Sequence, residues 1–154
     1  MTRTNAREIA VHLVYSLHYF DEAADTLLEQ LFEPEYYAGL GEASETYAEV
    51  PDEAQKTYIS TILRGVQEHL PELDDYIRRY AVGWSLERIS KISRAIMETA
   101  MFEALYVDDV PMAAAINEAV ELCKKYGDPE TAAFVNGILG SFAKEVASHD
   151  GAGI

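Results

Sequence analysis

The side chains best suited to acid–base or metal chemistry are scattered along this sequence rather than gathered in a catalytic spacing. The four histidines stand at positions 12, 18, 69 and 149, and none forms the HExxH pattern that places two zinc ligands on one helix face. The carboxylate doublets Asp74-Asp75 and Asp108-Asp109 are typical of solvated surfaces rather than of a catalytic pair. We therefore predict that the protein is not an enzyme and that it uses neither a cofactor nor a metal ion.

Motifs for nucleotide binding and nucleophilic catalysis are also missing from the sequence. It contains no P-loop, no GxGxxG after a strand and no GxSxG. The GILG at 137–140 matches the GxxG loop of KH domains, but it lies inside an apolar helical pattern without the strands of that fold. The single cysteine, Cys123, cannot form an internal disulfide, so we interpret it as a small buried hydrophobe in a cytoplasmic protein.

The charge of the chain is strongly acidic and unevenly distributed. The formal net charge is −15 over 154 residues, which at first argues against a nucleic-acid partner. The segment 21–53, however, holds eleven Asp and Glu and no Lys or Arg. We interpret this segment as a solvated connector, with an acidic docking surface as the alternative. The chain has no apolar run of ~18 residues, so no membrane segment is expected.

The elements that must position the side chains are helices throughout. Apolar residues recur at helical spacing, without strand alternation, and predict an all-α bundle of about seven helices. The region 34–51 reads as an acidic loop, 149–154 as a frayed tail, and 1–148 as a single domain. The predicted helices cover 4–20, 23–32, 52–68, 71–80, 85–106, 111–127 and 129–146.

Several helix ends are predicted from individual residues. Pro71 suits the first turn of a new helix, and Gly127 the position just after a helix end. Ser85 is the expected N-cap of the helix 85–106. The lone Trp84 is expected to be a buried anchor of the corner before this helix, with a ligand platform as the alternative.

Seven fragments in order resemble the NusB family of bacterial transcription antitermination factors. Each fragment alone is weak, but their order and compatible spacing are specific. They are AREIAVHLVYSLHY at 6–19, ILRGV at 62–66, DDYI at 74–77, W-x-L-x-R-I at 84–89, RAI with A-x-F-E within 94–103, DVP with AINEAVELCKKYG within 109–127, and FVNGIL at 134–139.

The resemblance implies an all-α fold of two packed helical subdomains. It also implies a factor that binds boxA-type single-stranded RNA together with NusE, a small-subunit ribosomal protein. With RNA polymerase, such a complex promotes read-through of ribosomal RNA operons. A homodimer is a further alternative for the assembly.

Candidate RNA contacts follow from the resemblance. The basic candidates are Arg3 and Arg7, which a helical wheel places away from the apolar stripe of the first helix, and Lys124 and Lys125. Phe134 is either a core residue or a platform for an unpaired base. Asn136 either faces the RNA or bonds between helices. The matching Asn117 is expected to bond inside the fold. Candidate partner contacts are Tyr15 and His18.

The sequence also departs from the family pattern. Only Arg3 and Arg7 are basic in the first 20 residues, where the family commonly has a cluster, and Glu98 stands where a basic residue is frequent. Because phosphate neutralisation sets affinity, weaker RNA binding is expected. The alternative function is a helical protein–protein interaction module of the same fold with little RNA affinity. The segment 78–94 could supply a second basic surface, or it could form ion pairs with the acidic segment.

Overall fold

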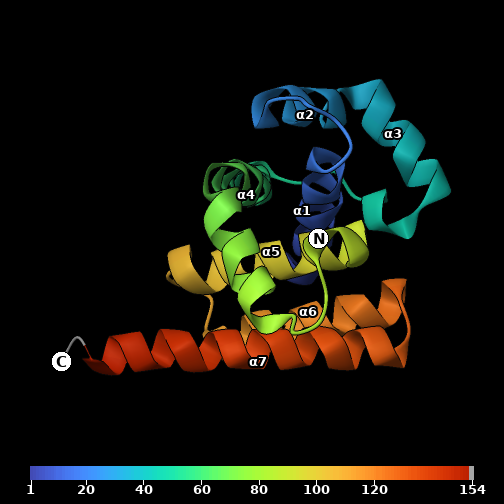
Figure 1. Cartoon of the computed structure of the whole chain (residues 1–154). Coiled ribbons are helices and arrows are strands. Elements are labelled where there is room, and N and C mark those ends of the chain that lie inside the picture. The colour runs from blue at the N-terminus through green and yellow to red at the C-terminus, as the bar shows by residue number, and fades with distance from the viewer. Residues whose placement is uncertain (153–154) are drawn as a thin grey trace. The chain divides into compact units, whose positions relative to one another are not determined.

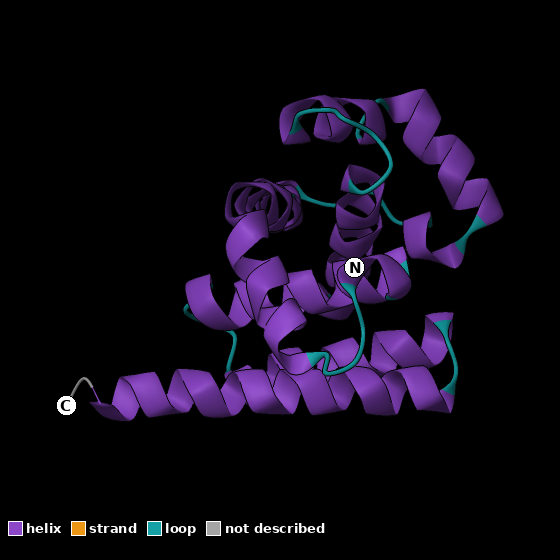
Figure 2. Ribbon diagram, in the orientation of Figure 1, coloured by secondary structure: helices purple, strands orange, loops and turns teal. Residues whose placement is uncertain are grey.

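The computed structural model describes the backbone of residues 1–152 and the side chains of residues 1–148. Within these residues the fold is all-α, with short 3-10 turns and no strand (Figures 1 and 2). The helices are α1 (Arg3–Leu17), α2 (Ala24–Leu31), α3 (Pro34–Ala43), α4 (Glu53–Tyr80), α5 (Lys91–Tyr106), α6 (Met112–Tyr126) and α7 (Pro129–Ala152), and the 3-10 turns are η1 (Glu45–Tyr47) and η2 (Leu86–Arg88).

The chain divides into two compact units, and the boundary falls within α4. The first unit is Met1–Glu68 and the second begins at His69. A single domain over 1–148 remains a prediction. Between them the two units hold seven α-helices among the described residues, the number predicted, but these helices do not all coincide with the predicted ones.

The first correction is α3, which occupies part of the region predicted as a loop. Glu33 caps this helix, because its carboxylate accepts hydrogen bonds from the backbone N–H groups of Glu35 and Tyr36. Pro34 fills the first helical position, where its missing N–H costs nothing. The two glycines in the segment suggested a break, but this start and the packing of α3 against α2 and η1 outweigh their low helix propensity.

The second correction is α4, which continues through Pro71 instead of ending before it. A proline inside a helix removes one hydrogen bond and costs about 3 kcal/mol. Apolar side chains are fully buried on both sides of it, for example Val66 and Leu73, and their burial offsets that cost. The predicted helices 52–68 and 71–80 are therefore one helix.

In the second unit, α5, α6 and α7 pack together around a shared core (Figure 1). Ser90, not Ser85, caps α5, because its hydroxyl accepts from the Ser93 N–H. The apolar residues at helical spacing in α7 predict an inner face at 134, 135, 138, 139, 142 and 146. Of these, the structure buries Val135, Ile138, Leu139 and Phe142. The helix α7 ends at Ala152, and residues 153–154 lie outside the described part, so the frayed tail at 149–154 stays a prediction.

Gly127 follows α6 as predicted, but not in a left-handed conformation. Its φ is −139°, so backbone strain does not require glycine there. Space favours glycine instead, because a Cβ at this position would lie 3.1 Å from the carbonyl oxygen of Cys123 and 3.2 Å from the Cβ of Thr131, so these neighbours would have to shift slightly. The close approach lets α7 start directly beside the end of α6.

Candidate functional site

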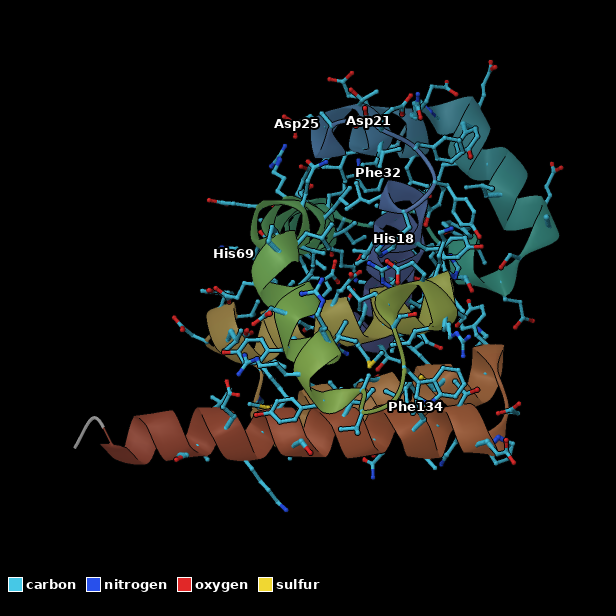
Figure 3. The ribbon with its side chains drawn as sticks, in the orientation of Figure 1. His18, Asp21, Asp25, Phe32, His69 and Phe134 are labelled. Atoms are coloured by element: carbon cyan, nitrogen blue, oxygen red, sulfur yellow. The ribbon has the colours of Figure 1, made fainter. Side chains whose placement is uncertain are left out.

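An aromatic pocket of about 370 Å³ opens in the second unit, between the turn that precedes α5 and the start of α7. Trp84 and Phe134 lie in its wall with ring centroids 5.8 Å apart and planes tilted by 59°. Phe134 is half-buried, and Figure 3 shows it at the second unit's α7. Trp84 is 51 % exposed, so the prediction that it is a buried anchor is wrong. We call this the Trp84–Phe134 pocket.

The exposure of Trp84 has a local cause. Gly83 adopts φ +85°, a conformation open to glycine at low cost, and it turns the chain away from the end of α4. Leu86 and Ile89 are the buried residues of the following turn, and they anchor the corner instead of Trp84. The indole is thereby left at the mouth of the pocket.

The rim of the Trp84–Phe134 pocket carries charges of both signs. Arg88 contributes an exposed guanidinium for which the described residues provide no ion pair. Asp128 and Glu130 lie at the start of α7. Hydrogen bonds from the backbone N–H and hydroxyl of Thr131, at 2.8 and 2.9 Å, hold the Asp128 carboxylate and lower its pKa. Flat aromatic walls with a mixed rim suit a planar heterocycle that has donor and acceptor edges.

Asn136 and Lys124 line a different pocket of about 400 Å³ between α6 and α7. Positions 134 and 136 are about 200° apart around a helix that turns about 100° per residue, so Phe134 and Asn136 point to different sides of α7. The structure therefore brings Asn136 together with Lys124, and it separates both from Phe134. The Lys124 ammonium lies 3.2 Å from Glu121 in an exposed ion pair. Such a pair is weak and can be exchanged for a phosphate.

The other candidates on α6 are exposed. Lys125 lies over the ring of Tyr126 at 5.6 Å from its centroid. Asn117 is also exposed, so the prediction that its amide bonds inside the fold is wrong. The two asparagines of the family-like fragments thus both reach the surface of the second unit.

The N-terminal arginines of the first unit occupy different environments. Arg3 is exposed and lies over the Tyr58 ring, 4.1 Å from its centroid. Arg7 is only 6 % exposed, so the prediction that it points away from the protein is wrong. The reason is that α1 buries an unbroken run from Ala6 to Val11, which leaves no solvent-facing side in this part of the helix.

The candidate partner residues lie toward the end of α1, in the first unit. The Tyr15 hydroxyl donates to Tyr19 at 3.0 Å, and their rings meet edge to face. This hydrogen bond and burial raise the pKa of Tyr15 above its ordinary value. His18 is half-buried at the end of the helix (Figure 3). Next to them, Tyr19 and Phe20 expose more than half of their surface.

The predicted basic surface at 78–94 is mostly neutralised by carboxylates of the same unit. Arg79 pairs with Asp75 at 3.2 Å and with Glu145. Arg94 pairs with Asp74 at 3.2 Å in a half-buried position. These partners lie outside the acidic segment 21–53, so that segment is not what neutralises them. Arg88 is the residue of this stretch that keeps an exposed charge next to a pocket.

A buried carboxyl group stands beside the Arg94–Asp74 pair. Glu98 is fully buried, and burial, followed by its hydrogen bond with Asp74, raises its pKa well above 4.5. The positive charge of Arg94 opposes this shift in pKa. Burial in the folded second unit therefore favours the protonated form of Glu98.

Sequence reasoning offered a ligand platform only as the alternative for Trp84, and it placed Arg88 in a broad basic surface without joining the two residues in one site. The available signal was a large aromatic residue directly after a glycine, with a base four positions further along the chain. Among the described residues, no group of three or more His, Cys, Asp or Glu is placed to hold a metal ion. Within the same residues, no helix is long and apolar enough to cross a membrane.

Comparison with known proteins identifies the family. The model of the NusB family matches residues 4–144. The transcription antitermination protein NusB of Carboxydothermus hydrogenoformans is 34 % identical over 95 % of this chain and 95 % of its own length. The protein of that name from Lactiplantibacillus plantarum is 38 % identical over 96 % of this chain and 99 % of its own length.

Solved structures agree with the sequence relatives. T. maritima NusB is 31 % identical and superimposes with a TM-score of 0.77, covering 94 % of this chain and 92 % of its own. A chain from a crystal structure of the antitermination factors NusB and NusE with double-stranded RNA has the same fold, with a TM-score of 0.75, 20 % identity, and coverage of 93 % of this chain and 96 % of its own. By sequence and by fold, the chain belongs to the NusB family.

Proposed function

We propose that this protein is a transcription antitermination factor that binds boxA-type single-stranded RNA together with NusE, and that acts with RNA polymerase to promote read-through of ribosomal RNA operons. The observation that carries the proposal is the family match across residues 4–144. The relatives are named as transcription antitermination proteins, and they match this chain over nearly its full length.

The Trp84–Phe134 pocket is where we place an unpaired base. Bases splayed out of single-stranded RNA are commonly held by aromatic rings and by hydrogen bonds to their edges. Because the two rings are tilted by 59°, one of them would stack on the base and the other would contact its side. Arg88 would donate to acceptors on the base edge, and Asp128 and Glu130 would accept from its donors. A carboxylate rim disfavours a phosphate inside the pocket, so the base rather than the backbone enters it.

The RNA backbone would be held by the exposed cations. In the second unit these are Lys124 and Lys125, with the Asn136 amide beside Lys124. In the first unit Arg3 is exposed, whereas Arg7 has little surface to offer a phosphate. We therefore assign Arg3 to RNA binding and Arg7 to the stability of α1. Tyr15 and His18 remain the proposed contacts for the protein partner.

The proposal is tested by titrating fluorescently labelled boxA-like RNA with the protein alone and with an equimolar mixture of the protein and NusE. A shuffled RNA of the same composition serves as the control. Tighter binding of the boxA-like strand, strengthened by NusE, is expected. If neither the protein nor its mixture with NusE distinguishes the two strands, the antitermination function is wrong for this chain.

A further inference from the structure

A second cavity, of about 410 Å³ and lined by both apolar and polar side chains, lies in the first unit between α1, α2 and α3. Leu27 and Leu31 of α2 form a buried wall, and Leu40 of α3 lies in the same cavity. The rings of Phe20 and Tyr36 line the cavity while 57 % and 54 % of their surfaces are exposed. Large rings exposed beside a cavity are typical of a binding surface. We call this surface the Phe20–Tyr36 groove.

One wall of the groove is held firmly in place. The Tyr47 hydroxyl is 2.6 Å from Nδ1 of His12, and the Tyr47 ring meets Tyr37 edge to face at 5.6 Å. Gly41 allows α3 and η1 to approach closely, because a Cβ there would lie 2.7 Å from the carbonyl oxygen of Tyr47. A groove with a fixed wall binds a partner at a lower entropic cost than one that must first become ordered.

The electrostatic surroundings of the groove are strongly negative. Glu22 lines the groove itself. It belongs to the segment 21–53, which holds eleven acidic residues and no basic one. Most of these carboxylates form no ion pair within the described residues. Those without an ion pair include Asp21, Glu22, Glu29, Glu35, Glu42 and Glu45.

The charge decides which kind of molecule the groove fits. RNA would be repelled, because Glu22 lines the groove and because Asp21 and Glu35 directly adjoin Phe20 and Tyr36 in the sequence. A second copy of this chain is also disfavoured by its net charge of −15. A cationic segment with apolar anchors is complementary in both properties.

We propose that the Phe20–Tyr36 groove docks a short basic segment of a partner protein. One or two large apolar side chains of that segment fill the groove, and flanking lysines or arginines face Glu22 and the neighbouring carboxylates. The acidic segment 21–53 is then a docking surface rather than a solvated connector. The residues that line the groove are not among the RNA contacts proposed above.

The test uses a synthetic peptide of lysine and leucine that forms an amphipathic helix, labelled for fluorescence anisotropy. Two matched peptides carry glutamate in place of lysine, or serine in place of leucine. The variants are Tyr36→Ala and Glu22→Lys, both at exposed positions, and the controls are Val82→Ala and Asp108→Lys, which are exposed in the second unit. Nuclear magnetic resonance maps the peptide onto the protein.

The lysine–leucine peptide is expected to bind and to shift resonances of the groove, and the two matched peptides to bind at least about tenfold more weakly. Tyr36→Ala and Glu22→Lys should each weaken binding about tenfold, the effect of losing one central contact. The two control variants should bind like the parent protein, and Tyr36→Ala should leave RNA affinity unchanged. The proposal would be overturned if both groove variants bound the peptide as tightly as the parent protein, or if the shifted resonances mapped to another surface. This conclusion does not depend on the result of the RNA titration.

Discussion

Phe134 shows how one side chain can be a structural and a binding residue at once. It is half-buried and touches Trp84, yet its ring lines an open pocket. We predict that Phe134→Ala weakens RNA binding by about 1–3 kcal/mol, the worth of one stacked base. Electrophoretic mobility shift or anisotropy titration at fixed salt measures this loss.

The matched variant Phe134→Leu separates stacking from packing. Leucine keeps much of the apolar volume but lacks the aromatic face. We expect Phe134→Leu to lose about as much RNA affinity as Phe134→Ala while it unfolds closer to the parent temperature. Full RNA affinity in Phe134→Leu would show that the ring serves only the core.

The two N-terminal arginines provide a second pair of matched variants. Arg7 is buried in α1, so Arg7→Ala should lower the free energy of unfolding by about 1–3 kcal/mol, as other losses of buried polar groups do. Arg3 is exposed, so Arg3→Ala should change stability little and weaken RNA binding. Urea denaturation and RNA titration of both variants measure these effects. The reverse pattern would restore Arg7 as the phosphate contact.

The buried carboxyl group of Glu98 should make the free energy of unfolding depend on pH. Its pKa in the folded protein is raised well above 4.5 by burial and then by Asp74. Because the unfolded chain loses this proton at a lower pH, the free energy of unfolding falls as pH rises from about 4.5 to the raised pKa. Glu98→Gln cannot ionise, so we expect it to flatten this dependence and to be more stable than the parent at pH about 8.

Urea denaturation between pH about 5 and about 8 is the measurement for Glu98→Gln. The exposed Asp108→Asn is the control, because it also removes one carboxylate but lies outside the core. An equal effect of the two variants on the pH dependence would mean that net charge, rather than the buried group, is responsible.

At the scale of the element, the two glycines of α3 are expected to respond differently to substitution by alanine. A Cβ on Gly41 would lie 2.7 Å from the Tyr47 carbonyl oxygen, whereas a Cβ on Gly39 would meet nothing within 4 Å. We predict that Gly41→Ala destabilises the protein because η1 must move. Gly39→Ala should stabilise it by about 0.5–1 kcal/mol through higher helix propensity.

Thermal unfolding of the two glycine variants compares them directly. If both stabilise the protein, the contact between α3 and η1 is not tight in solution, and the wall of the Phe20–Tyr36 groove is not fixed. If both destabilise it, the helical conformation of α3 itself is wrong, since an alanine at Gly39 has open space around it.

At the scale of the whole molecule, the net charge of −15 predicts that RNA binding depends on a partner. Each phosphate contacted on single-stranded RNA adds roughly −0.7 to the slope of log K against log salt. With Arg3, Lys124 and Lys125 as the exposed cations proposed for RNA, the protein alone should show a slope of about −1.4 to −2.1. The mixture with NusE should show a steeper slope, measured by titration at several salt concentrations. An equal slope for both would mean that this chain alone supplies every phosphate contact.

The sequence by itself determined the helical fold, the inner face of α7 and the family. These depend on local periodicity and on fragments in order, which neighbours in space do not alter. The ends of helices were predicted less accurately. At Pro71, for example, the proline disfavours a continuous helix, but the burial of apolar side chains on both sides of it favours one. The helical α3 was missed for the same reason, since its glycines are weak helix formers that the packing against η1 compensates.

Only the tertiary structure decided which polar and aromatic side chains reach the surface. A helical wheel assumes one buried face, but α1 buries an unbroken run of residues, so Arg7 is enclosed although the wheel turns it outward. Trp84 is exposed because Leu86 and Ile89 anchor its corner, which no spacing rule could indicate. The pairing of Asn136 with Lys124 and of Phe134 with Trp84 also depends on which elements lie side by side, and that is set by packing between segments far apart in the sequence.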